Sequence, residues 1–301
     1  MNKAFTPRVV EHMRPYIQQI VDFLIDSIEA QGQMDVIRDL AFPLPLLVIA
    51  EMIGLPAEDR KRFKQWSDDT FAVLGVIRHS PELMAKAAQS MTEMADYILA
   101  LGKERRLQPK EDLLTALATV AGEGERLTHD ELVANVGVIL AAGHETTTNL
   151  IGNGVLALLR HPEQLQALRE TPALAAATVE EVMRYDNPVQ VVYRSTVEEV
   201  KMGDKTIGKG QLVNMILGAA NRDPEYFSHP DRFDISRDDG KHIGFGLGIH
   251  FCLGAPLARL EGQIAFNTLL RLMPDLHLTP DALEWQEHPT FRGLKSLPIA
   301  F

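Results

Sequence analysis

Apolar residues recur at helical spacing through most of the first 185 residues. Thr6 before Pro7 marks the start of one helix, with apolar positions from Val9 to Ile28, and further helices are expected from Pro56 and over 81–106. Thr128 and Glu131 form a capping box, and no stop signal follows before 161–162. A helix of about 30 residues, roughly 45 Å long, is therefore expected there. Such a length would cross a whole domain.

After Pro188 the pattern changes to short strand-like pieces. These are 190–196, then 199–210 with a Gly-Asp turn, then 211–219. A coil rich in proline and aspartate follows, then a last helix after Pro256 and a strand-like end at 297–301. Helices first and a small sheet later predict a mainly α, α+β fold, treated as one domain over 1–301.

Composition narrows the function classes. The 301 residues carry a formal charge of −11, and the basic residues are scattered, which argues against a nucleic-acid partner. The longest apolar run, 41–50, contains two prolines and is too short to span a bilayer, and the first residues lack the apolar core of a secretory signal. One cysteine excludes an internal disulfide, which fits a reducing compartment. We therefore expect a cytoplasmic protein, and the apolar pattern predicts no membrane partner.

The single cysteine, Cys252, lies in the stretch FGLGIHFCLG. A lone cysteine is most often a small buried apolar residue, so the thiol is structural, reactive or a ligand. Glycines around it permit tight turns, and amides near the helix that starts at Pro256 would lower the pKa of the thiol. Zinc is a poor candidate because the sequence offers no second cysteine and no paired-histidine spacing. A haem needs only one protein ligand.

The pattern Phe245-Gly246-x-Gly248-x-His250-x-Cys252-x-Gly254 resembles the haem-ligand loop of the cytochrome P-450 family. This resemblance implies a soluble, bacterial-type haem-thiolate monooxygenase with haem b (iron protoporphyrin IX), in which Cys252 binds the iron. It also implies that the reaction inserts one oxygen atom of dioxygen into a hydrophobic small molecule, typically as a hydroxylation.

Other motifs extend the resemblance. Residues 142–147, AGHETT, resemble the oxygen-binding stretch of the family, which implies that Ala142 faces the haem and that Glu145 and Thr146 deliver protons. Glu181 and Arg184 resemble the family's ExxR motif, with Arg232 of PDRF as the third member of a structural lock. Arg194 and His250 would bind the haem propionates. The expected substrate pocket consists of Val138, Ala141, Val189, Val192 and Phe291, with Ala142 adjoining it.

Members of this family are longer at the front, and about the first quarter of a typical member has no counterpart here. That part holds most strands of the principal sheet and a loop over the pocket. The electrons would have to come from a partner, because the sequence shows no flavin, nicotinamide or iron–sulfur motif. The resemblance implies that this partner is a ferredoxin or flavodoxin with its reductase. The alternatives are a peroxide-driven relative, a truncated haem-binding protein without turnover, and a helical interaction protein with an inert thiol.

Overall fold

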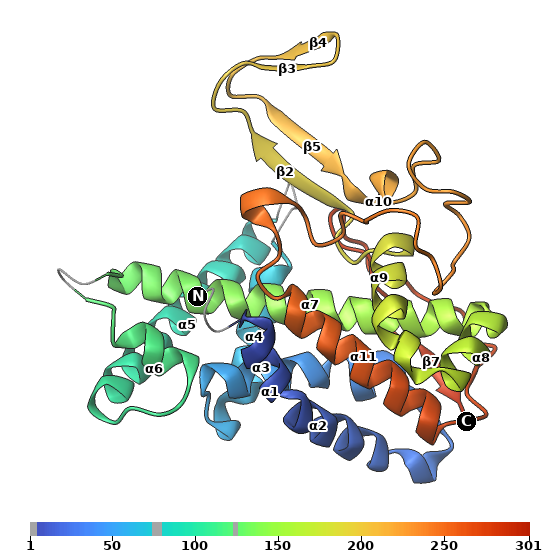
Figure 1. Ribbon diagram of the computed structural model, residues 1–301. Helices are drawn as coiled ribbons and strands as arrows, with labels where there is room; N and C mark the ends of the chain where they lie inside the picture. The colour runs from blue at the N-terminus through green and yellow to red at the C-terminus, as the bar shows by residue number, and fades with distance from the viewer. Residues whose placement is uncertain (1–4, 74–79, 123–125) are drawn as a thin grey trace.

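One long helix, α7 (His129–Arg160), crosses the protein (Figure 1). It belongs to a computed structural model that describes residues 5–73, 80–122 and 126–301. At its start the Glu131 amide donates to the Thr128 hydroxyl at 3.1 Å, and the Thr128 amide donates to the Glu131 carboxylate at 2.8 Å. The predicted capping box and long helix are therefore confirmed.

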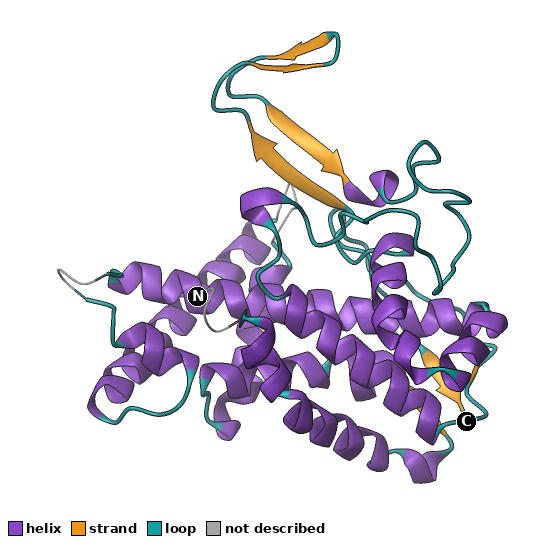
Figure 2. Cartoon of the chain, in the orientation of Figure 1, coloured by secondary structure: helices purple, strands orange, loops and turns teal. Residues whose placement is uncertain are grey.

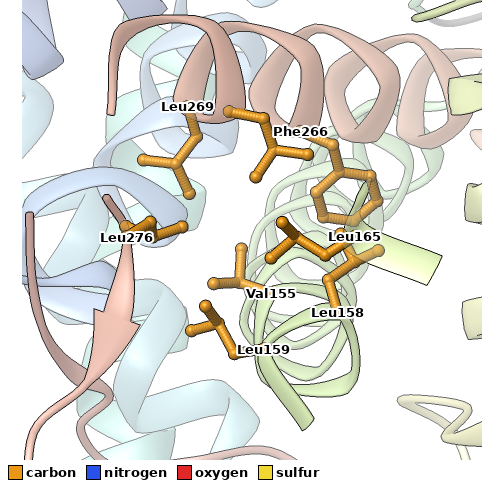
Figure 3. Close-up of a pocket in the computed structure, with 8 residues that line it drawn as sticks. Val155, Leu158, Leu159, Leu165, Phe266, Leu269 and Leu276 are labelled. Atoms are coloured by element: carbon orange, nitrogen blue, oxygen red, sulfur yellow. The ribbon is translucent and has the colours of Figure 1, made fainter. Parts of the chain in front are cut away.

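The core lies where α7 packs against α3 (Pro43–Ile53), α9 (Ala175–Tyr185) and α11 (Ala255–Leu272). Gly154 of α7 allows this close approach, because a Cβ there would overlap the ring of Phe266 on α11. Nearby, side chains of α7, α8 (Pro162–Glu170) and α11 converge around a small, wholly apolar gap (Figure 3). This packing fixes the spacing between α7 and α11, the two helices that flank the site described below.

The N-terminal helices differ from the prediction in one respect. The expected single helix from Val9 to Ile28 is broken at Met13 into α1 (Pro7–His12) and α2 (Arg14–Asp26). Pro15 has no amide hydrogen to continue the ladder of the first helix, so the chain starts a new one. The segment after Pro56 begins with a 3-10 turn and continues as α4 (Arg60–Phe71). The other α-helices are α5 (Pro81–Leu107), α6 (Leu113–Ala118) and α10 (Leu217–Ala220).

A three-stranded antiparallel sheet joins the two ends of the chain. Its order is β1 (Gln33–Asp35), β7 (Pro298–Ala300), β6 (His277–Leu278), and Met34 pairs with Ile299. The predicted strand at the C-terminal end is therefore confirmed.

Two strand pairs project from the helical body (Figure 2). β2 (Val191–Ser195) pairs antiparallel with β5 (Leu212–Ile216), and β3 (Val200–Met202) pairs with β4 (Lys205–Ile207) across the predicted Gly-Asp turn. The fold is thus mainly helical with small antiparallel sheets, as predicted. Across the described ranges, no helix combines the length and apolar character that crossing a bilayer requires.

Candidate active site

The cysteine loop precedes the N-terminus of α11 and is closed by its own backbone. The Cys252 amide donates to the Phe245 carbonyl at 2.8 Å, and the single turn 248–250 lies between them. Gly246 and Gly248 have φ values of 72° and 64°, in the left-handed region that residues with a Cβ rarely adopt. The two glycines therefore let the loop fold back on itself.

The Cys252 thiol is accessible from a cavity, and the amides of Gly254 and Ala255 point to its sulfur. Burial raises the pKa of this thiol, and those two amides and the charge of Arg259 offset the rise only in part. The sequence-based expectation of a lowered pKa is therefore wrong for the chain by itself, because desolvation outweighs the helix start. A coordinated metal ion deprotonates a thiol outright, so the loop still suits a thiolate ligand.

A cavity of about 450 Å³ separates the cysteine loop from α7. Its volume lies within the range of small-molecule sites. The structure brings to its wall all five residues of the expected substrate pocket, which are Val138, Ala141, Val189, Val192 and Phe291. Among the expected cofactor residues, it also brings Ala142, Arg194, Phe245, Gly246, His250, Cys252 and Gly254 there. Gly248 lies in the loop but does not line the cavity.

The residues present fit a haem. The cavity wall is mainly apolar, which suits a porphyrin face, and it contains the chain's one cysteine, whose thiolate is a soft metal ligand. Arg194 and His250 line the same cavity and offer hydrogen-bond donors to the carboxylates of a propionate edge. Arg194 lies on β2, and one of its guanidinium nitrogens donates to the Tyr193 carbonyl at 2.8 Å. The other guanidinium N–H groups can donate to a ligand.

The acid and the alcohol predicted on α7 face different surroundings. Thr146 lines the cavity and donates its hydroxyl to the Ala142 carbonyl at 2.6 Å. Glu145 does not line the cavity. Its carboxylate accepts a hydrogen bond from Gln286 at 3.1 Å, and burial raises its pKa.

Glu181 and Arg184 form a buried ion pair behind the cysteine loop. Two nitrogens of Arg184 donate to the Glu181 carboxylate at 2.7 and 2.9 Å. Arg184 also donates to the Asn221 carbonyl, and the Asn221 side chain in turn accepts from the Ile243 amide, two residues before Phe245. The pair is thus tied to the base of the loop.

The third arginine of this cluster is not the one expected. The Arg232 side chain is 65% exposed and approaches Asp234, and only its backbone carbonyl receives a hydrogen bond from Arg184. Arg237, five residues later, is 9% exposed and lies 3.4 Å from Glu181. The assignment of Arg232 is wrong because this side chain lies largely in solvent and only the backbone carbonyl of Arg232 contacts the pair.

Sequence reasoning missed other residues of the site. Glu261 of α11 lines the cavity, is fully buried, and has a pKa raised well above its ordinary value by that burial. Its position four residues after Leu257, on the apolar face of the helix, was the available signal. Phe71, which stacks on Phe291 with ring centres 4.3 Å apart, also lines the cavity. No local pattern marked Phe71, because its role depends on contact with a distant segment.

Comparison with known proteins shows the family of the chain. The family model described as cytochrome P-450 matches residues 1–171 and 173–274. The cytochrome P-450 CYP107DY1 of Priestia megaterium is 44% identical over 301 residues, which is 100% of this chain and 72% of that protein. The cytochrome P-450 monooxygenase PikC of Streptomyces venezuelae is 46% identical over 99% of this chain and 71% of its own length.

A solved structure gives the same result for the fold. P450BioI, in complex with an acyl carrier protein ligated to hexadec-9Z-enoic acid, superposes with a TM-score of 0.95 and is 42% identical, covering 100% of this chain and 77% of that one. About a quarter of each of these proteins lies outside the match. On the family match, the sequence identities and the shared fold, this chain belongs to the cytochrome P-450 family.

Proposed function

We propose that the chain is a haem-thiolate monooxygenase that inserts one oxygen atom of dioxygen into a hydrophobic small molecule. Members of its family are oxidoreductases that use haem b, and one relative is named a monooxygenase. The observation that carries the proposal is that Cys252 and Thr146 reach one cavity from separate elements, the loop before α11 and the middle of α7.

The residues of this chain have distinct tasks in the proposal. Cys252 would bind the iron, and Arg194 and His250 would hold the propionates. When bound, the haem supplies the redox chemistry that cleaves dioxygen, and a thiolate ligand favours that cleavage. The Thr146 hydroxyl, on the cavity wall, would pass a proton into the cavity, and the neighbouring Glu145 carboxyl would supply it. Glu181, Arg184 and Arg237 keep the cysteine loop in place.

The apolar wall supports a hydrophobic substrate. Val138, Ala141, Val189, Val192 and Phe291 would contact it. The P450BioI structure is a complex with an acyl carrier protein ligated to hexadec-9Z-enoic acid, and that ligand belongs to that protein. The electrons would come from a ferredoxin or flavodoxin with its reductase. The single cysteine and the bacterial relatives support a cytoplasmic location.

The test is an absorption spectrum of the purified chain supplied with haem, reduced with dithionite and exposed to carbon monoxide. A strongly red-shifted Soret band in the parent, lost in Cys252→Ser, would support thiolate ligation. Product formation that depends on reductant would then separate an enzyme from a haem-binding protein without turnover. Failure to bind haem, or a band typical of neutral ligands, would contradict the proposal for this chain alone.

A further inference from the structure

We propose that Gln286 is a positioning residue that holds the Glu145 carboxylate in the orientation needed for proton delivery. This inference rests on the proposed function. Gln286 Nε2 donates to Glu145 Oε1 at 3.1 Å, across 141 positions of sequence. Gln286 lies outside the cavity, so it would act through Glu145 and not on the substrate.

The Glu145 side chain is 14% exposed, and few groups face it. On its own helix, His144 Nδ1 is 4.0 Å from Glu145 Oε2, and burial lowers the pKa of this histidine to about 4, which leaves it neutral near pH 7. From α4, Lys64 and Asp68 act on the carboxyl through their charges and pair with each other at 2.7 Å. Among the described side chains, Gln286 alone donates a hydrogen bond to this carboxylate.

Tight packing explains how Gln286 reaches α7. The backbone amide of Gln286 donates to the Gly293 carbonyl at 2.9 Å, and a β-bridge pairs Trp285 with Leu294. These contacts form a narrow hairpin over residues 285–294. Gly293 lies directly against Asn149, so that a Cβ at Gly293 would overlap the side-chain amide of Asn149. Asn149 is four residues after Glu145, one helical turn along α7. The glycine thus brings the hairpin close enough for Gln286 to bond Glu145.

The chemistry of an amide suits a positioning role. The side-chain amide of Gln286 can donate a hydrogen bond but cannot itself gain or lose a proton near neutral pH. By occupying Oε1, it leaves Oε2 to receive and release the proton. A hydrogen bond to the ionised carboxylate also counteracts the effect of burial, which disfavours the charged form. Gln286 therefore fixes both the direction of the carboxylate and the pH range over which it can exchange protons.

The test is an infrared titration of the full chain labelled with ¹³C-glutamate, with the Glu145 band assigned by its loss in Glu145→Gln. In Gln286→Leu we expect the pKa of Glu145 to rise by about one unit, since a hydrogen bond to a charged group is lost. In Gln286→Glu, which keeps the shape of the side chain, the rise should be larger because two acids compete for one proton. The matched control is Gln166→Leu, which removes a similar amide–carboxylate bond on the surface of α8.

The variants separate positioning from simple structural support. An unchanged pKa of Glu145 in both Gln286 variants would overturn the inference, and Gln286→Glu keeps the test decisive if Gln286→Leu does not fold. With haem and reductant, Gln286→Glu should form less product per electron pair than the parent. The pH at which product formation follows the ionisation of Glu145 should also be higher than in the parent. The infrared titration needs no haem. A chain that shows the pKa shift but binds no haem would therefore contradict the proposed function while leaving the contact with Glu145 established.

Discussion

Arg237 Nε lies 3.4 Å from Glu181 Oε2, and both side chains are buried. Replacing Arg237 by Ala would leave a buried carboxylate with one fewer positive partner. Removal of one member of a buried ion pair typically costs about 3–5 kcal/mol. We therefore expect Arg237→Ala to lower the free energy of unfolding by a few kcal/mol, measured by urea denaturation followed by circular dichroism.

Arg232→Ala is the matched control for this prediction. Its guanidinium is 65% exposed, and the Arg232 carbonyl that Arg184 uses belongs to the backbone. The expected change is below about 0.5 kcal/mol, as at ordinary surface positions. Equal losses in the two variants would show that Arg237 has no special place in the Glu181 cluster.

The difference between these two arginines shows what the sequence could predict. The cysteine loop was predictable because its requirements are local: Gly246 and Gly248 adopt positive φ, and Pro256 lies in the first turn of a helix. The identity of the third arginine depends on which way the chain turns between 232 and 237, and no local pattern sets that direction.

The same reasoning applies to the acid on α7. Helical periodicity could place Glu145 next to Thr146, but not show that Thr146 alone of the two lines the cavity. The contact between Glu145 and Gln286 depends on packing between α7 and a hairpin 141 positions away. The long helix, the strand pairs and the pocket valines followed from periodicity, local turn signals and family resemblance, whereas long-range polar contacts did not.

Thr146→Ala tests proton delivery. Thr146 and Thr148 both donate their hydroxyls to the carbonyl four residues earlier, at 2.6 and 3.1 Å, but only Thr146 lines the cavity. In the haem-loaded chain with its electron donor, we expect Thr146→Ala to lower product per electron pair on the order of tenfold and to raise hydrogen peroxide release. Thr148→Ala should resemble the parent. A similar loss in both variants would indicate disturbance of the helix and not loss of the cavity hydroxyl.

Glu180 gives a prediction for acid stability. Burial opposes its ionisation, but hydrogen bonds from Arg259 at 2.6 and 2.8 Å and contact with His242 outweigh burial, so its pKa falls from 4.5 to about 2. A carboxyl with a lowered pKa in the folded state stabilises the fold above the unfolded value and loses that contribution as it is protonated. The stabilisation should therefore be present above pH 4.5 and disappear between pH 4.5 and about 2.

Glu180→Gln should flatten this part of the stability profile. The Glu180 side chain is 40% exposed, so the solvent screens the pair and the expected difference is below about 1 kcal/mol. Unfolding free energies at several pH values, compared with those of the exposed variant Glu163→Gln, would measure it. An undiminished slope between pH 4.5 and 2 in Glu180→Gln would assign the acid sensitivity to other groups.

Gly293 should tolerate no side chain. A Cβ there would overlap the Asn149 amide, and Asn149 is fully buried on α7, so either the hairpin or the helix must move. Overpacking of this kind typically costs about 1–3 kcal/mol. We expect Gly293→Ala to lower the free energy of unfolding by that amount and to raise the pKa of Glu145, because the displaced hairpin carries Gln286 away.

Gly208→Ala is the control, since a Cβ at Gly208 meets only ordinary contacts. Loss of stability without any change at Glu145 would show that Gln286 reaches the carboxylate independently of this packing.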